Sequence, residues 1–258
     1  MSRSDTSVRV LISAGAAGIG RAIAETFETA GARVWVVDLD EAALETCPAA
    51  WRHGCLDVTD EAAVKALFAE IGQDWGGLDV LCANAGIAGP TAPVEDIELD
   101  AWRRCVSVNL EGAFLFAKHA APLMKAQGSG AMTLISSTAG LYGYPNRAAY
   151  CAAKWGVIGL MKTLAMELGP FGVRANAICP GAVEGPRMEG VLQREAEAKG
   201  TTRDAVYAGY ASGTSLRRFV TAKDVANMAA FLASDAARLV SGQVIAVDGH
   251  TENPDPKV

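Results

Sequence analysis

The segment VRVLISAGAAGIGRAIAETFETAGARVWVVD, residues 8–38, decides the fold. It begins with a β-branched and aliphatic run that is typical of a strand buried on both faces. A turn of small residues follows, and residues 21–30 then place apolar side chains along one helical face. Gly31 ends the predicted helix, and residues 34–37 predict a second buried strand that finishes at Asp38. Strand, tight turn, helix and strand in this order predict an α/β fold.

The turn from Ser13 to Gly20 predicts a binding site for a diphosphate. Glycine and alanine let backbone N–H groups approach a bulky anion closely, and the next helix directs its positive N-terminus at the same place. Asp38 stands 18 residues after Gly20, at the carboxyl end of the second strand. A carboxylate there accepts hydrogen bonds from an adenosine ribose and repels the extra phosphate of NADP, so we expect NAD. The alternative, a close helix–strand crossing that needs only small residues, does not account for this context.

Length and composition fit one α/β domain of 258 residues with a sizeable core. The formal net charge is -6, and the longest basic clusters are the pairs Arg103-Arg104 and Arg217-Arg218. Such pairs are too short to neutralise a row of nucleic-acid phosphates. Arg21 interrupts the apolar segment near the N-terminus before it could span a bilayer. We therefore expect a cytoplasmic protein without an export signal and with neither nucleic acid nor membrane as a partner.

The cysteines and histidines lack the spacing of a metal site. The six cysteines contain no Cys-x-x-Cys pair, and the three histidines are scattered along the chain. Buried, reduced thiols are the expected state, which suits the cytoplasm. We expect no catalytic metal.

The remaining pattern continues the alternation of strands and helices. Strands are expected at 52–56, 78–82, 131–136, 173–179 and 243–247, and helices at 40–46, 61–75, 98–125, 148–168 and from 221, where Thr221 and Asp224 form a capping box. Polar or small residues follow several strands at the carboxyl edge, where ligands of open α/β sheets bind. Asp57 there is expected either to contact an adenine ring or to cap the next helix. Asn84 is expected to brace neighbouring strands while Ala85 and Gly86 leave room for the cofactor's sugars, although a simple turn is the alternative.

Residues 185–215 interrupt the βα rhythm with two charged helical pieces, 188–199 and 203–210. We expect a substrate lid here, and the alternative is a solvated surface excursion. Some side chains of the lid and of the loop after Ser137 are expected to face the substrate, the alternative being packing alone. These candidates are Tyr142, Tyr144, Met188, Tyr207 and Tyr210.

Tyr150 and Lys154 lie four residues apart on a predicted helix, so they project from the same face. A phenol with its ordinary pKa near 10 is a poor base at neutral pH, but an adjacent ammonium favours the phenolate. Tyr150 is then able to take a hydroxyl proton while hydride leaves the same carbon for the cofactor. Ser137, 13 residues upstream, would hold that oxygen in line. Asn109 sits in an apolar helix, where a hydrogen-bonding task is more plausible than a solvent-facing position.

Taken together, these segments resemble the short-chain dehydrogenase/reductase family over nearly the whole chain. The resemblance rests on Gly15-Ala-Ala-Gly-Ile-Gly20, Asn84-Ala-Gly86, Asn109, Ser137, Tyr150-Cys-Ala-Ala-Lys154 and Pro180-Gly181. It implies a single Rossmann-like, doubly wound domain with a mostly parallel sheet of seven strands. It also implies that Tyr150 is the general acid/base, that Lys154 lowers the tyrosine pKa and binds the nicotinamide ribose, and that Asn109 holds a water in the proton relay. Relatives in this family are commonly tetramers or dimers built through the long helices.

The residues expected to bind NAD are Ser13, Gly15, Ala17, Gly18, Ile19, Gly20, Asp38, Leu39, Asp57, Val58, Asn84, Ala85, Gly86, Tyr150, Lys154, Pro180, Gly181 and Val183. Two positions depart from the family's pattern. Ala14 replaces the usual first glycine of the turn, which changes the expected geometry there. Gly185 replaces a threonine often found five residues after the proline, so the carboxamide would be anchored by backbone groups such as those at Val183.

The resulting prediction is an NAD-dependent oxidoreductase that interconverts a secondary alcohol and a ketone. One alternative is a reductase of 3-oxoacyl thioesters, against which Asp38 argues because it disfavours NADPH. A second alternative is a non-catalytic dinucleotide sensor, which has no need of Ser137, Tyr150 and Lys154 together.

Overall fold

The computed structural model describes residues 7–254, and these form one seven-stranded sheet in the order β3-β2-β1-β4-β5-β6-β7. The strands are β1 (Arg9–Ser13), β2 (Arg33–Asp38), β3 (Arg52–Cys55), β4 (Val80–Ala83), β5 (Gly130–Ile135), β6 (Val173–Pro180) and β7 (Val244–Val247). Each pair of neighbours is parallel. The predicted fold is confirmed, with one correction: the sheet is entirely parallel over the described residues, where we expected a mostly parallel one.

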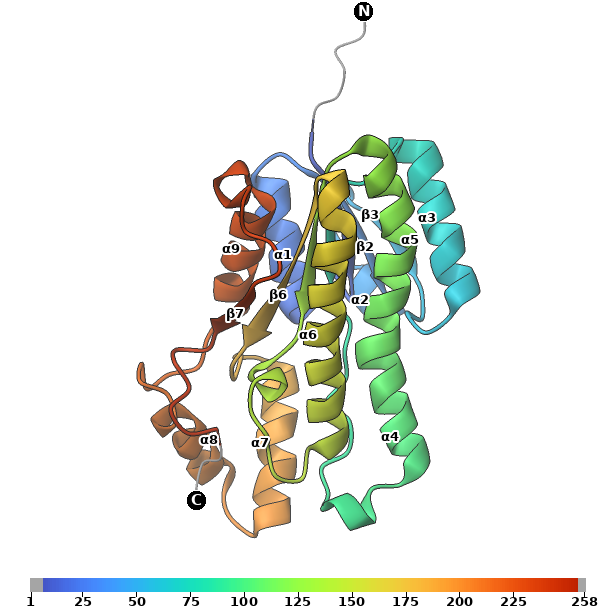
Figure 1. Ribbon diagram of the computed structural model, residues 1–258. Coiled ribbons are helices and arrows are strands. Elements are labelled where there is room, and N and C mark those ends of the chain that lie inside the picture. The colour runs from blue at the N-terminus through green and yellow to red at the C-terminus, as the bar shows by residue number, and fades with distance from the viewer. Residues whose placement is uncertain (1–6, 255–258) are drawn as a thin grey trace, which may run out of the picture.

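Helices cover both faces of the sheet (Figure 1). They are α1 (Gly18–Thr29), α2 (Glu41–Leu44), α3 (Glu61–Trp75), α4 (Leu99–Val106), α5 (Gly112–Gln127), α6 (Ala148–Leu168), α7 (Pro186–Lys199), α8 (Arg203–Ser212) and α9 (Ala222–Ala233). The predicted capping box of α9 is present, with Thr221 and Asp224 exchanging side-chain and backbone hydrogen bonds. No helix of the described chain is both long enough and apolar enough to cross a bilayer.

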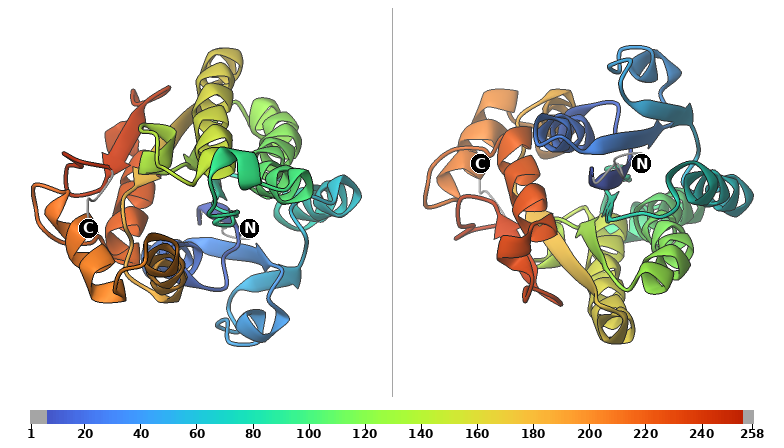
Figure 2. Two further views of the ribbon diagram at one scale, coloured as in Figure 1. Left: turned by 90° about the horizontal axis from the view of Figure 1, so that it is seen from below. Right: turned by 90° about the horizontal axis from the view of Figure 1, so that it is seen from above.

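The alternation of side chains along each strand builds two apolar cores. Leu11 and Trp35 point into a core shared with α3, α5 and α6. Val10 and Ile12 point the other way, into a core shared with α1 and α9. Both end-on views in Figure 2 show these helical layers on opposite sides of the strands. Because both faces are covered, the central strands β1, β2 and β4 consist mainly of buried apolar residues, as is typical of parallel sheets.

The strand order reverses next to β1, which lies between β2 and β4. The chain winds outward to β3 on one side of β1 and then continues through β4 to β7 on the other side. A crevice at the carboxyl ends of the strands on either side of such a switch point is where ligands of open α/β sheets bind. Helices α7 and α8 lie beyond this edge, in the lower part of Figure 1. The fold thus places the predicted lid over the predicted site.

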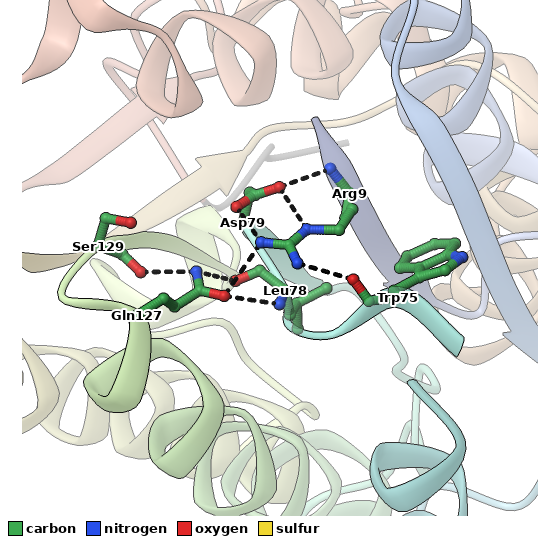
Figure 3. Close-up of polar contacts among 6 residues, drawn as sticks. All are labelled: Arg9, Trp75, Leu78, Asp79, Gln127 and Ser129. Carbon is green, nitrogen blue, oxygen red and sulfur yellow. Dashed lines mark hydrogen bonds and ion pairs between the residues drawn. The ribbon is translucent and has the colours of Figure 1, made fainter. Parts of the chain in front are cut away.

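The opposite, amino-terminal edge of the sheet is tied together by Arg9 (Figure 3). Its Nε and Nη2 donate to the two carboxylate oxygens of Asp79 at 2.8 and 2.7 Å. Its Nη1 donates to the carbonyl of Trp75 at 2.9 Å, and Nη2 also reaches the Gln127 side chain at 3.1 Å. Gln127 in turn accepts from the backbone N–H of Leu78 at 3.0 Å. This network joins β1 to the start of β4 and to the end of α5.

Four of the six cysteines are buried as predicted, namely Cys82, Cys105, Cys151 and Cys179. The prediction was wrong for Cys55, which is exposed, and only partly right for Cys47, which is half-buried. Cys55 ends β3, the edge strand of the sheet, where few elements are left to cover a side chain.

Candidate active site

A cavity of about 480 Å³ opens at the carboxyl edge of the sheet. Its wall combines the glycine turn, the ends of β2 and β6, the segment after β5, the start of α6 and helices α7 and α8. Most of the residues predicted to bind the cofactor lie in this wall: Ala17, Gly18, Ile19, Asp38, Asn84, Gly86, Tyr150, Lys154, Pro180, Gly181 and Val183.

The other predicted cofactor residues of the described chain lie outside the cavity wall: Ser13, Gly15, Gly20, Leu39, Asp57, Val58 and Ala85. Some of them support it from behind. The Ser13 hydroxyl accepts hydrogen bonds from the backbone N–H groups of Asn84 and Ala85, both at 3.0 Å. The Asn84 side chain donates to the carbonyls of Ser13 and Ala14. Asn84 therefore braces the strands as predicted, and direct contact of the supporting residues with a cofactor stays a prediction.

The glycine turn is tight because its residues leave no room for larger side chains. A Cβ atom at Gly15 would lie 2.6 Å from Cβ of Val36, and one at Gly20 would overlap the carbonyl of Ala14. Ala14 adopts φ of 51°, the left-handed region that glycine enters freely and alanine rarely does. The departure from the family's glycine at this position therefore leaves the turn intact at the cost of backbone strain.

Asp38 holds the turn and also faces the cavity. One carboxylate oxygen accepts from the N–H of Ala16 at 3.1 Å, and the other accepts from Leu39 at 2.8 Å. Asp57 instead binds Thr59 through its backbone N–H at 2.9 Å and its hydroxyl at 2.7 Å. These two hydrogen bonds from Thr59 hold the pKa of the Asp57 carboxyl below its usual range. The alternative expected for Asp57 was capping of the next helix together with Thr59 and Asp60; in the structure Asp57 binds Thr59, and Asp60 is the residue that caps α3.

Tyr150, Lys154 and Ser137 lie together in the cavity wall. The Lys154 ammonium lies 5.7 Å from the ring centroid of Tyr150, as expected for residues one turn apart on α6. Lys154 is 2% exposed, and its Nζ donates to the carbonyl of Ile135 at 2.9 Å. Ser137 accepts from the N–H of Ala139 at 3.1 Å, which fixes its hydroxyl at the end of β5. These three predicted catalytic residues are thus brought together by the segment after β5 and by α6.

Asn109 lies in a single π-helical turn, Ser107–Glu111, between α4 and α5. Its amide donates to the carbonyls of Ile87 at 3.0 Å and Cys105 at 2.9 Å. Its oxygen is buried without a hydrogen-bond partner among the described residues. A Cβ at Gly86 would come within 2.5 Å of this oxygen and 3.3 Å of the Lys154 ammonium, so both groups border the same small space. A π turn is frequent at functional sites, and an unmet acceptor there suits a water molecule.

Of the five candidate substrate residues, three line the cavity and two lie outside its wall. Tyr144, Met188 and Tyr210 line the cavity. Tyr207 stacks on Phe219, with ring centroids 4.4 Å apart. The Tyr142 hydroxyl is directed to the carbonyl of Thr251 at 3.5 Å. Substrate contact by Tyr142 and Tyr207 stays a prediction, whereas the other three have the position it requires.

Comparison with known proteins identifies the chain's relatives. Residues 14–250 match a family model described as "Enoyl-(Acyl carrier protein) reductase". The chain is 39% identical over 248 residues to cis-4-hydroxycyclohexanecarboxylate dehydrogenase of Sinomonas cyclohexanicum, covering 93% of this chain and 95% of that one. A crystal structure of an oxidoreductase of the short-chain dehydrogenase/reductase family from Burkholderia thailandensis has a TM-score of 0.80 and 36% identity, covering 95% of this chain and 92% of that one. This chain belongs to the short-chain dehydrogenase/reductase family.

Membership in the short-chain dehydrogenase/reductase family makes the chain an oxidoreductase that acts on CH–OH donors, as the sequence predicted. A crystal structure titled NAD+-bound xylitol dehydrogenase has a TM-score of 0.89 and 28% identity, covering 95% of this chain and 99% of that one. Relatives at this level of similarity are alcohol dehydrogenases and ketone reductases acting on secondary alcohols.

The residues present in this family member fit a dinucleotide. Four residues of the turn border the cavity, namely Ala14, Ala17, Gly18 and Ile19. Residues 14–18 are all alanine or glycine, so no side chain in this part of the turn is larger than a methyl group. Gly86 borders the space between Asn109 and Lys154, which a Cβ there would fill. Gly181 is packed against Asp248, where a Cβ would lie 2.9 Å from that residue's Cα. Among residues 7–254, no group of three or more histidine, cysteine or acidic side chains could hold a metal ion.

One residue of this short-chain dehydrogenase/reductase escaped the sequence analysis. Arg147 lines the cavity, and its guanidinium carbon lies 5.0 Å from the ring centroid of Tyr150. Its spacing of three residues before the tyrosine was the available signal, because such residues are neighbours on a helix. The spacing could not be used, because Arg147 lies in the loop before the helix and the helical pattern of the sequence begins only at Ala148.

Proposed function

We propose that this enzyme interconverts a secondary alcohol and a ketone with NAD as its cofactor, running mainly as an oxidation. The observation that carries the proposal is the convergence of Ser137, Tyr150 and Lys154 on one cavity whose other end is a glycine turn. When bound, the nicotinamide ring supplies a hydride acceptor or donor. The chain's own residues supply binding, alignment and the proton.

Tyr150 is the proposed general acid/base. Its phenolate takes the proton from the substrate hydroxyl during oxidation, and the resulting phenol returns the proton during reduction. Lys154 favours the phenolate because its ammonium is buried close to the ring. Ser137 holds the substrate oxygen in line. Asn109 holds a water through its unmet oxygen, which gives the proton a route away from Lys154.

The preference for NAD over NADP is proposed from Asp38. Its carboxylate faces the cavity at the end of β2, where the adenosine ribose of a dinucleotide is expected to lie. The two hydroxyls of that ribose are good donors to a carboxylate, whereas the phosphate that replaces one of them in NADP meets a like charge. The backbone hydrogen bonds from Ala16 and Leu39 keep Asp38 in position for this discrimination.

We further propose a cytoplasmic homo-oligomer, a tetramer or a dimer. Large apolar side chains are exposed along α4, α5 and α6, where a second copy would cover them: Leu99, Phe114, Trp155 and Met166. Sedimentation of the purified protein tests this proposal, since a monomer would refute it.

The function is tested by offering the purified protein NAD or NADP with a panel of secondary alcohols, polyols, hydroxy acids and hydroxyacyl thioesters, and following absorbance of the reduced cofactor. We expect turnover of secondary alcohols with NAD preferred. A preference for NADP would refute the role given to Asp38. Turnover confined to the thioesters would favour the reductase of 3-oxoacyl thioesters instead.

A further inference from the structure

Arg147 places a cation against the catalytic tyrosine. The residue is the N-cap of α6, and its guanidinium carbon lies 5.0 Å from the ring centroid of Tyr150. Nη2 donates to the carbonyl of Ala88 at 3.0 Å, which anchors the guanidinium to the loop after β4. Arg147 also lines the cavity, so a molecule whose hydroxyl reaches Tyr150 passes close to this cation.

The charge of Arg147 is unmatched by the described residues. None of their carboxylates forms an ion pair with it, and its Nε is enclosed without a hydrogen-bond acceptor among them. Glu195 borders a small neighbouring pocket together with Arg147, but one of its oxygens pairs with Lys199 at 2.9 Å. Its other oxygen accepts from the Tyr210 hydroxyl at 2.7 Å. Glu195 is therefore already satisfied by partners within the lid.

The remaining charges of the cavity wall do not neutralise Arg147 either. The acids in the wall are Asp38, which accepts N–H groups of the glycine turn and its own strand end, and Glu184, which is exposed. The other cation, Lys154, is buried and donates to Ile135. The half-buried guanidinium of Arg147 lines this wall and donates only to Ala88 among the described residues, and its planar fork matches a carboxylate, so the arrangement suits recognition of an anion.

We propose that Arg147 binds a carboxylate of the substrate, so that the preferred alcohols are small hydroxy acids. This inference rests on the proposed function, since it places the reacting hydroxyl at Tyr150 and Ser137. Because the guanidinium packs on the ring of Tyr150, the carboxylate of the bound substrate would lie on the side of the reacting carbon that faces this ring. Tyr210 and Met188 of the lid supply the rest of the wall around the substrate.

A different role for Arg147 would be to act on Tyr150 alone. A cation beside the ring would favour the phenolate whatever the substrate, and its loss would weaken turnover of charged and neutral alcohols equally. The two roles therefore differ in their dependence on the charge of the substrate, which decides the experiment.

The first measurement is binding, which needs no turnover. Titration calorimetry compares cyclohexanecarboxylate with cyclohexanecarboxamide, with and without NADH. We expect the wild-type protein to bind the carboxylate at least about tenfold more tightly, and Arg147→Gln to lose that preference. Arg147→Lys should retain part of it, because an ammonium keeps the charge but not the two-pronged geometry. Thermal unfolding followed by circular dichroism confirms that each variant is folded.

The second measurement is the ratio of kcat/KM for 4-hydroxycyclohexanecarboxylate to that for its carboxamide. We expect Arg147→Gln to lower this ratio about 10- to 100-fold, mainly through KM, while the pH profile of kcat for the amide stays in place. The matched control is Arg203→Gln, which removes a lid arginine that pairs with Glu189 outside the cavity, and it should leave the ratio unchanged.

Three results would overturn the inference. In the first, Arg147→Gln lowers kcat/KM equally for the hydroxy acid and its carboxamide. In the second, Arg147→Gln shifts the pH profile of kcat for both substrates. In the third, the wild-type protein binds the carboxylate no more tightly than the carboxamide. The proposed function fails separately, when no alcohol of the wider panel is oxidised with either cofactor, and the binding comparison still decides the role of Arg147 in that case.

Discussion

At the scale of single residues, the sequence predicted the contacts of the site that are made within one helical turn. Tyr150 and Lys154 were predicted to be neighbours because four residues make about one helical turn, and the structure places the ammonium 5.7 Å from the ring centroid. Arg147 was not found, because its contact with Ala88 depends on a loop 59 residues earlier in the chain. Tyr144 and Tyr210 line the cavity, whereas Tyr207 does not. The sequence did not predict this difference, because it depends on how the loop after Ser137 and residues 185–215 pack in three dimensions.

The first prediction concerns Tyr150. Replacing it by phenylalanine removes the proposed acid/base and should lower kcat about 10²- to 10⁴-fold, while NADH binding, followed by fluorescence, stays within about twofold. Tyr207→Phe is the matched control, because Tyr207 packs on Phe219 away from the cavity, and it should cost less than about tenfold. Ordinary turnover by Tyr150→Phe would remove the tyrosine from its assigned role.

The second prediction concerns Asp38. Asp38→Asn removes the negative charge and keeps one of the two oxygens that accept from the backbone N–H groups of Ala16 and Leu39. We expect the ratio of kcat/KM for NAD to that for NADP to fall roughly tenfold or more, because discrimination by repulsion is lost. Asp40→Asn, which changes the capping residue of α2, is the control and should leave the ratio in place. An unchanged ratio in Asp38→Asn would show that cofactor choice lies elsewhere.

At the scale of elements, patterns within a few residues predicted best. The capping box of α9 needs only Thr221 and Asp224, and it is present. Residues 98–125 were expected to form one helix, and the apolar spacing is indeed continuous, but the structure contains a π turn at Ser107–Glu111. The extra residue of that turn directs Asn109 inward, and apolar periodicity over so short a distance does not distinguish 3.6 from 4.4 residues per turn.

The third prediction tests strain in the glycine turn. Ala14 has φ of 51°, and an alanine in this left-handed conformation costs about 1–2 kcal/mol. Glycine removes that strain from the folded state, but it also stabilises the unfolded chain by increasing its conformational freedom, which offsets part of the gain. Ala14→Gly should therefore stabilise the fold by about 0.5–1 kcal/mol in urea unfolding. Ala66→Gly, at an exposed position in the interior of α3, should instead destabilise it by about 1 kcal/mol. A destabilised Ala14→Gly would mean that the methyl group contributes packing that outweighs the strain.

At the scale of the whole molecule, the alternation of strand and helix patterns predicted one doubly wound domain with seven strands, mostly parallel. The strand order and the parallel pairing of all seven strands came from the structure. What the sequence did not reveal was the amino-terminal edge, where Arg9, Asp79 and Gln127 meet from positions up to 118 residues apart. Burial raises the pKa of the Asp79 carboxyl, but the hydrogen bonds from Arg9 outweigh this and hold it below its usual range.

The fourth prediction follows from that depressed pKa. An unfolded aspartate titrates near pH 3.9, so the Arg9–Asp79 contribution is fully present above that pH and is lost as the pH falls through the lower folded pKa. Asp79→Asn should lower the free energy of unfolding by about 1–2 kcal/mol at pH 7, and the gap to wild type should close below pH of about 4. Urea unfolding at several pH values measures this. Asp100→Asn, in an exposed ion pair with Arg103, is the control and should change stability by less than about 0.5 kcal/mol. A gap for Asp79→Asn that persists into acid would contradict the charge-based account.

Because every strand of the described sheet runs the same way, the Arg9 network and the cavity lie at opposite edges of one sheet. Heat tolerance and substrate choice can accordingly be altered in separate rounds of mutagenesis, the former at residues 75–79 and 127–129 and the latter around Arg147 and the lid. During the evolution of such enzymes, residues at the cavity edge can change and alter the substrate, while the residues at the opposite edge continue to stabilise the fold.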